Sequence, residues 1–342
     1  MRKLATIRTI DDILPIPDAD AIEVAVVGGW KVVVKKGEYQ PGDVAVYCEV
    51  DSWIPHTIAP FLSKGQEPRE YNGVKGERLR TIKLRGQLSQ GLLLPYNILA
   101  GLLTLGDFAY PTIGHDVSDE LGVQKYEPPV PAQLAGQVEG PWPSGIQKTD
   151  QERIQNLTAE WETLRAHAYE ITEKLEGSSM SAGLVDGKFV VCSRNLNLRE
   201  TEGNSLWAQA RRYSIEEKLR AAHMDNIIIQ GELIGEGVQG NHYSIKGQDF
   251  YVFDVLDIKA GRYLDPADRR ALVDKLQLKL VPVIETAAVI SALTVDQVLA
   301  MADGSSVLNA GKLREGLVFK CATDGTVHWK AVSNKYLLKT GG

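Results

Sequence analysis

Lys174 is the side chain of this sequence with the clearest capacity for covalent chemistry. It opens the tetrad Lys174-Leu175-Glu176-Gly177, which lies just past a predicted strand. A lysine amine that attacks the α-phosphorus of a nucleotide needs close backbone packing behind it, and glycine permits this where a side chain would obstruct the triphosphate. The tetrapeptide alone is a weak signal, because most isolated lysines are solvated surface groups. Its interpretation therefore depends on the residues downstream of it in the chain.

Five further segments rich in glycine, charged and aromatic residues come after the tetrad in order. They are Ser193–Asn195, Gly231–Gly235, Phe250–Asp254, Glu315–Lys320 and His328–Lys330. This series resembles the motif set of the covalent nucleotidyltransferases, which include the polynucleotide ligases and the RNA capping enzymes. The Gly-Glu-Leu-x-Gly segment, the Phe-Tyr-Val-Phe-Asp segment and the ending Lys330–Leu337 are most similar to those of ATP-dependent RNA ligases with an N-terminal OB domain.

The resemblance implies an activity, its cofactors and its partner. The expected partner is a nicked duplex, RNA/RNA or RNA/DNA, whose 3′-hydroxyl strand ends in RNA, and the expected cofactors are ATP and Mg²⁺ or Mn²⁺. Lys174 would attack the α-phosphate of ATP, AMP would pass from the lysine to the 5′-phosphate, and the 3′-hydroxyl would displace AMP. Each step is an in-line displacement at phosphorus, so alignment and charge stabilisation should dominate.

Four residues are implied to be catalytic: Lys174, Glu232, Glu315 and Lys330. A free lysine has a pKa of about 10.4, so little of it is nucleophilic at neutral pH. A nearby divalent cation would disfavour the ammonium form and neutralise phosphate oxygens. Glu232 and Glu315 are therefore expected to hold the metal, with Glu176 as a further acidic candidate.

Nucleotide binding is implied for seven residues, which are Arg153, Glu176, Gly177, Arg194, Phe253, Lys320 and Lys330. The guanidinium fork of Arg194 suits phosphate and sugar oxygens, and Phe253 matches the aromatic residue that stacks on adenine. Lys330 would contact the α-phosphate, with Lys320 on the same surface. Arg153, on a predicted entry helix, would reach the β- and γ-phosphates.

His328 departs from the pattern of the related ligases, which often carry Lys-x-Lys in the last motif. An imidazole has an ordinary pKa of about 6.5 and supplies less positive charge than a lysine. We therefore expect a weaker phosphate contact there, and we assign His328 no catalytic role.

The chain is long enough for two cores, because single cores stop growing at about 250 to 300 residues. Short runs broken by turn residues predict an N-terminal all-β OB-type barrel at 1–126. A stretch rich in proline and glycine predicts a linker at 127–146. Mixed strands and helices predict an α+β nucleotidyltransferase domain at 147–342.

Helix starts are predicted at three places in the second domain. Thr149 with Glu152 forms a possible capping box, and apolar residues at helical spacing come after it, namely Ile154, Leu157, Trp161 and Leu164. Asp265-Pro266 and Thr294 with Gln297 give two further start signals.

A basic run in the N-terminal domain is predicted to contact backbone phosphates of the duplex. Its members are Lys75, Arg78, Arg80, Lys83 and Arg85. A solvated strand face is the alternative explanation of such a run. The net charge of −6 argues against binding through bulk electrostatics, so any nucleic-acid contact should be local.

Other features point to a cytoplasmic monomer without a predicted protein partner. No apolar run is long enough to span a bilayer, and the first residues do not resemble a secretory signal. Cys48, Cys192 and Cys321 are too widely spaced for a metal pair or a disulfide framework.

Three alternatives remain open from the sequence. A DNA ligase shares the lysine chemistry. A GTP-dependent capping enzyme does too, although it usually carries its OB domain after the catalytic one. A non-enzymatic RNA-binding repair scaffold is the third, and the joint presence of Lys174, Glu232, Glu315 and Lys330 argues against it.

Overall fold

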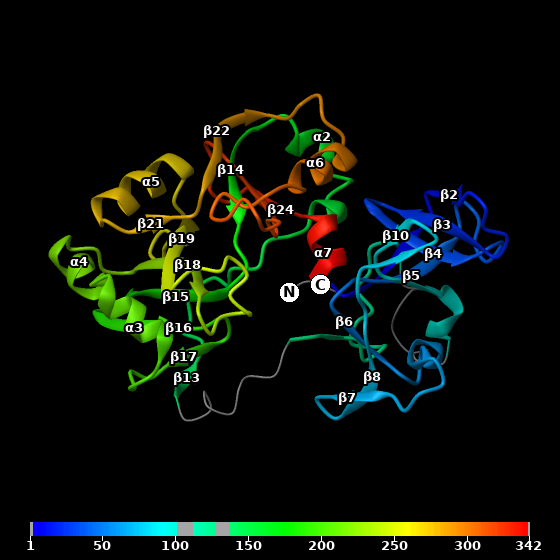
Figure 1. The fold of residues 1–342 in the computed structure, drawn as a ribbon, viewed down its shortest axis with the longest axis horizontal. Helices are drawn as coiled ribbons and strands as arrows, with labels where there is room; N and C mark the ends of the chain where they lie inside the picture. Colours follow the sequence, from blue (N-terminus) through cyan, green and yellow to red (C-terminus); the bar gives the residue numbers. More distant parts are fainter. Residues whose placement is uncertain (1–2, 101–111, 128–136, 341–342) are drawn as a thin grey trace. The chain divides into compact units, whose positions relative to one another are not determined.

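The computed structural model describes residues 3–100, 112–127 and 137–340 (Figure 1). The chain divides into two compact units. The first comprises Met1–Pro129 with Gln155–Ala159 and Leu337–Gly342, and the second comprises Val130–Ile154 with Glu160–Tyr336. Part of the predicted linker, residues 128–136, lies outside the described residues. No helix in the described part of the chain is both long and apolar enough to cross a membrane.

The first unit is built from strands, as the sequence predicts. One antiparallel sheet has the order β1-β5-β11, a second β2-β3-β4, a third β12-β6-β8-β7, and β9 pairs with β10 alone. The bounds are β1 Ala5–Thr9, β2 Asp12–Pro15, β3 Ile22–Val27, β4 Trp30–Lys35, β5 Val44–Cys48, β6 Ser52–Pro55, β7 Arg69–Tyr71, β8 Val74–Arg78, β9 Ile82–Leu84, β10 Gln87–Ser89, β11 Leu92–Pro95 and β12 Gln124–Lys125. Among the described residues of this unit there are also two 3₁₀ turns, η1 at Pro60–Ser63 and η2 at Tyr96–Leu99.

Strand β5 separates two apolar clusters in this unit. Ala45 and Tyr47 belong to one cluster, whereas Val46 and Cys48 belong to the other. Successive side chains of a strand point to opposite faces, so a strand buried on both sides serves two cores at once. The predicted hairpin of β3 and β4 across Gly28-Gly29 is confirmed.

The second unit contains two sheets. The larger has the order β13-β17-β16-β15-β18-β19-β20, with β21 parallel to β19, and the smaller has the order β22-β14-β23-β24. The bounds are β13 Val138–Pro141, β14 Ala168–Lys174, β15 Ser178–Val185, β16 Lys188–Cys192, β17 Leu196–Leu198, β18 Ile227–Gly235, β19 Gln248–Asp257, β20 Arg262–Tyr263, β21 Lys279–Leu280, β22 Val283–Val289, β23 Gly316–Cys321 and β24 His328–Val332. The predicted α+β architecture is confirmed.

Helices pack on each sheet of this unit (Figure 1). Those against the larger sheet are α3 Ser205–Arg212, α4 Ile215–Ala221 and α5 Pro266–Lys275, and α6 Val295–Ala302 lies against the smaller one. Helix α7 spans Asn334–Thr340. The predicted start of α5 after Asp265 is confirmed, as is the capping box of Thr294 and Gln297 on α6.

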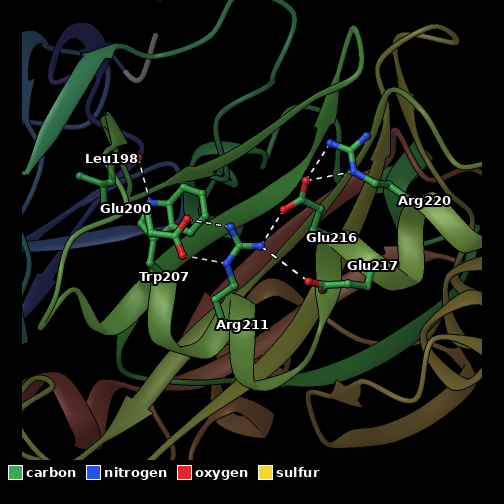
Figure 2. A network of polar contacts seen from close by, with 7 residues as sticks. All are labelled: Leu198, Glu200, Trp207, Arg211, Glu216, Glu217 and Arg220. Carbon is green, nitrogen blue, oxygen red and sulfur yellow. Dashed lines mark hydrogen bonds and ion pairs between the residues drawn. The ribbon is translucent and has the colours of Figure 1, made fainter.

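Helices α3 and α4 are joined by Arg211 (Figure 2). Its guanidinium contacts the carboxylates of Glu200 and Glu216, at 2.7 and 2.6 Å, and also lies over the ring of Trp207. The indole of Trp207 donates to the carbonyl of Leu198 at 2.9 Å. Planar guanidinium groups suit such bidentate and stacked contacts, so this network ties α3 to α4, and the Trp207 indole ties α3 to β17.

The prediction that a helix begins at Thr149 is wrong. The segment contains only the 3₁₀ turn η3 at Ile154–Asn156 and the short helix α2 at Trp161–Leu164. The backbone of Lys330 donates to the carbonyl of Glu152 at 2.9 Å, and Arg153 forms a parallel bridge with Lys330. Pairing with a strand keeps this stretch extended, so its apolar spacing reflects burial and not helical periodicity.

Candidate active site

The Lys174 tetrad connects the two sheets of the second unit. Lys174 ends β14 in the smaller sheet, and Ser178 begins β15 in the larger one. A Cβ atom at Gly177 would lie 2.2 Å from the carbonyl oxygen of Leu233 and 2.9 Å from Cγ of Glu232. Only glycine fits at this approach. The turn after the lysine is therefore pressed directly against β18, where Glu232 lies.

Cross-strand register places the predicted lysines on one face of the smaller sheet. Residues directly opposite each other share a face, and alternate residues of one strand share it too. The opposed pairs are Lys174 with Gly316, Val318 with Lys330, and Lys320 with His328. The other face carries the rings of Phe319 and Trp329, stacked at 4.0 Å.

Lys174 forms an ion pair with Glu315. Its Nζ lies 2.6 Å from Oε1 of Glu315, and the two side chains are 27% and 18% exposed. Glu315 immediately precedes β23, the strand that pairs with β14. The amine is thus held in a defined position and still open to an incoming molecule.

Glu232 lies close enough to Lys174 and Glu315 for their charges to act on its carboxyl. Burial raises its pKa to about 8, Lys174 acts against the rise, and Glu315 adds to it. The charges of Arg194 and Glu176 also act on it. A carboxyl with this pKa holds a proton at neutral pH until another cation replaces it. The structure therefore brings together residues from four separate sequence segments.

Glu176 contacts two residues that the sequence analysis missed. Nδ1 of His242 lies 3.2 Å from Oε2 of Glu176, and Nε2 lies 2.7 Å from the carbonyl oxygen of Leu313. The imidazole thus lies between the Glu176 carboxylate and the Leu313 carbonyl, with Nε2 donating to the carbonyl. The hydroxyl of Tyr243 accepts a hydrogen bond from the backbone of Glu176 at 2.7 Å. The only feature of the sequence that could have drawn attention to His242 and Tyr243 is that this polar and aromatic pair follows a glycine-rich stretch.

Phe253 occupies a β-bulge in β19. Gln230 opposes Asp254 while Gly231 opposes Val252, so Phe253 is the extra residue. A bulge re-aims a side chain and leaves its backbone unpaired in the ladder. The ring of Phe253 is partly buried against the cluster that contains Leu175, the residue after the nucleophile candidate.

The carbonyl freed by this bulge is bound by two buried cations. Arg269 donates to it at 3.0 Å and Lys320 at 3.1 Å. Lys320 is 1% exposed and also forms an ion pair with Asp254. Burial lowers the pKa of Lys320 to about 8, against the effect of Asp254. Lys320 thus ties the smaller sheet to β19 from the same face that carries Lys174 and Lys330, and it is buried there against Asp254.

The two predicted arginines lie in different surroundings. Arg153 is buried and pairs through its backbone with Lys330 in β24. Arg194 lies in the turn between β16 and β17, about half exposed, with Nη2 2.5 Å from Oδ1 of Asp150. Arg194 is therefore reachable from solvent, whereas Arg153 supports the strand beside the site.

Comparison with known proteins decides the family. A family model described as RNA ligase matches residues 167–337, and one described as an OB-fold domain matches residues 4–96. The chain belongs to the RNA ligase family. The predicted order of an OB domain followed by a ligase domain is confirmed.

Solved structures of Naegleria gruberi RNA ligase resemble this ligase over nearly its whole length. An apo point mutant is 45% identical, with a TM-score of 0.90 over 98% of this chain and 97% of that one. A mutant with AMP and Mn is 46% identical, and a mutant with ATP and Mn is 45% identical, each with a TM-score of 0.90 over 98% of both chains. No curated protein matches significantly.

The ligase contains no preformed metal cage among its described residues, since no group of three His, Cys, Asp or Glu side chains is arranged to hold an ion. Glu232 and Glu315 nevertheless fit one. Mg²⁺ is commonly held by one or two carboxylates together with substrate phosphates. Burial is the main cause of the raised pKa of Glu232, and the charge of the neighbouring Glu315 adds to it.

Proposed function

We propose that this RNA ligase uses ATP and a divalent cation to seal 3′-hydroxyl/5′-phosphate nicks in duplexes whose 3′-hydroxyl strand ends in RNA, through a covalent Lys174–AMP intermediate. The observation that carries the proposal is the Lys174–Glu315 pair at the junction of the two sheets, beside Glu232. The ATP, AMP and Mn in the Naegleria gruberi structures support the same choice of ligands.

In the first step, the deprotonated amine of Lys174 attacks the α-phosphorus of ATP. The N–P bond forms as the nitrogen gives up one proton to solvent, the bond from the α-phosphorus to the bridging oxygen breaks, and pyrophosphate leaves. Lys330 lies on the face of the smaller sheet that also carries Lys174 and would offset charge on the α-phosphate. Glu315 orients the amine through the contact described above.

The remaining steps move AMP and then release it. An oxygen of the 5′-phosphate attacks the phosphorus of Lys174–AMP, so that a P–O–P linkage forms and the N–P bond breaks, returning the amine. The 3′-hydroxyl then attacks the 5′-phosphorus, loses its proton and expels AMP. A new phosphodiester bond results. Both steps need alignment more than covalent chemistry from the protein.

Glu232 and Glu315 would hold the divalent cation, which when bound neutralises phosphate charge. Phe253 would stack on adenine from the bulge of β19, with Glu176 and Arg194 at the ribose and phosphates. We further propose that the OB domain at 1–126 engages the duplex and the domain at 147–342 carries out nucleotide transfer, with 127–146 as linker.

Incubation with α-labelled ATP and Mg²⁺ or Mn²⁺ tests the proposal. We expect an alkali-stable label that acid and hydroxylamine release, on the wild type and on Lys188→Ala, an exposed lysine of β16 that pairs with Glu139. The Lys174→Ala variant should carry no label. Labelling of Lys174→Ala, or none of the wild type, would refute the covalent intermediate.

The 3′-end preference needs a second assay. Nicked duplexes that differ only by ribose or deoxyribose at the 3′-hydroxyl terminus should be sealed at different rates, with the ribose end faster. Equal rates on both ends would favour the DNA ligase alternative, because the sugar is then not read.

A further inference from the structure

The hairpin of β9 and β10 is a tight, exposed arm of the first unit. Its two-residue turn, Arg85-Gly86, has φ values of 45° and 84°, as a type I′ turn requires. The side chains from Ile82 to Gly86 are exposed, whereas Ser89 is buried. We call residues Ile82–Ser89 the basic hairpin.

The base of the basic hairpin is anchored on β4. The hydroxyl of Ser89 accepts from the backbone of Val33 at 3.0 Å, and the backbone of Gln90 donates to Lys31 at 2.8 Å. The amide of Gln90 also contacts Thr81 at 3.4 Å. A rigid base with an exposed tip positions the tip without covering it.

One face of the basic hairpin carries two exposed aliphatic side chains. Ile82 is 46% exposed and Leu84 39% exposed. They are opposite Ser89 and Gln87 and therefore point to the same side, away from Lys83. Scattered apolar residues on a surface are ordinary, but two on one face of a projecting hairpin form a contact surface.

The five cations of the predicted basic run fall into two groups, which differ in whether a carboxylate pairs with them. Lys75 pairs with Glu67 at 2.6 Å, and Arg78 pairs with Asp51 at 2.6 Å. In the part of the chain that the structure describes, no carboxylate lies within ion-pair distance of the remaining three cations, which are Arg80, Lys83 and Arg85. These cations are available to an external anion, and the two paired ones are already neutralised.

We propose that the basic hairpin lies in the minor groove of the duplex that flanks the nick, with Ile82 and Leu84 on the ribose faces and Arg80, Lys83 and Arg85 on the phosphates. The inference rests on the proposed function. The minor groove of A-form RNA is wide and shallow and displays its riboses, so a two-stranded arm fits it. The apolar face of the arm can lie on the riboses while Lys83 on its other face, Arg85 in its turn and Arg80 just before it reach the phosphates along the rim.

Binding of the full-length protein to a fluorescent nicked RNA duplex without ATP, over a series of salt concentrations, tests this assignment. The triple variant Arg80→Ala/Lys83→Ala/Arg85→Ala should reduce the magnitude of the slope of log affinity against log salt by roughly 3, one unit for each lost phosphate contact. The variant Ile82→Ser/Leu84→Ser should bind roughly tenfold more weakly with the slope unchanged. Matched controls are Lys75→Ala, an exposed but paired lysine, and Phe61→Ser, an exposed aromatic elsewhere in the unit.

Three results would overturn the inference. The first is a wild-type slope for the triple variant, and the second is wild-type affinity for the double serine variant. The third is a change in oligomeric state by sedimentation with RNA binding intact, which would assign the apolar face to a second copy of the chain. All variants should keep Lys174 labelling by ATP, so failure of the covalent proposal is scored separately from failure of this one.

Discussion

Nζ of Lys174 lies 2.6 Å from Oε1 of Glu315, because the end of β14 pairs with the start of β23. This contact joins the first and the fifth of the six chemically marked segments of the chain. It also places the nucleophile candidate against one of the two candidate metal-binding carboxylates. The site is therefore a product of strand pairing within the smaller sheet, with Glu232 added from the larger one.

Replacing Glu315 by glutamine should slow Lys174 adenylylation roughly 100-fold. Glutamine keeps the size of the side chain but removes the charge that orients the amine and helps to hold a cation. Single-turnover labelling with ATP measures the rate. Glu285→Gln, an exposed carboxylate on β22, should label like the wild type. An unchanged rate for Glu315→Gln would remove this carboxylate from the mechanism.

Lys320→Met should lower the free energy of unfolding by about 3 to 5 kcal/mol. The change leaves Asp254 charged and buried without its partner. Urea unfolding measures the loss. The double variant Lys320→Met/Asp254→Asn should recover a large part of it, since the unpaired charge is gone. A double variant as unstable as the single one would show that the ion pair is not the cause.

Because of His328, the free energy of unfolding should decrease as the pH falls below about 6.5. Burial lowers its pKa, and the charge of Lys320 lowers it further. Below about pH 6.5 the unfolded chain takes up the proton first, so stability present above that pH is lost as the pH falls toward the lowered value. His328→Gln should flatten the pH dependence of the unfolding free energy in that window. His115→Gln, an exposed histidine of the first unit, should leave it unaltered; equal slopes in all three proteins would contradict the assignment.

His242→Ala should reduce the adenylylation rate about tenfold by releasing the carboxylate of Glu176, a contact to a charged group. A double-mutant cycle with Glu176→Gln supplies the control. Because the two residues are in contact, the combined effect should be smaller than the sum of the single effects. Strict additivity would mean that His242 acts elsewhere.

Local features of the chain were predictable from neighbouring residues. The β3–β4 hairpin arises from two strand-forming runs around Gly28-Gly29, and the start of α6 from Thr294 with Gln297. These structures depend on hydrogen bonds and periodicities that span a few positions. Membership of the RNA ligase family and the order of an OB domain before a ligase domain could also be read from the sequence alone.

Other features were decided only by tertiary contacts. The segment after Thr149 pairs with Lys330 and does not form the predicted helix. Phe253 lies in a β-bulge of β19, without a partner residue in β18. Lys320 is buried in an ion pair with Asp254. The contact of His242 with Glu176 joins separate loops. The register of paired strands and the burial of charged side chains away from water depend on residues far apart in the chain. A local sequence pattern therefore cannot predict them. The sequence therefore indicated which side chains are candidates for the site, and the packing of the two sheets decided which of them lie close together.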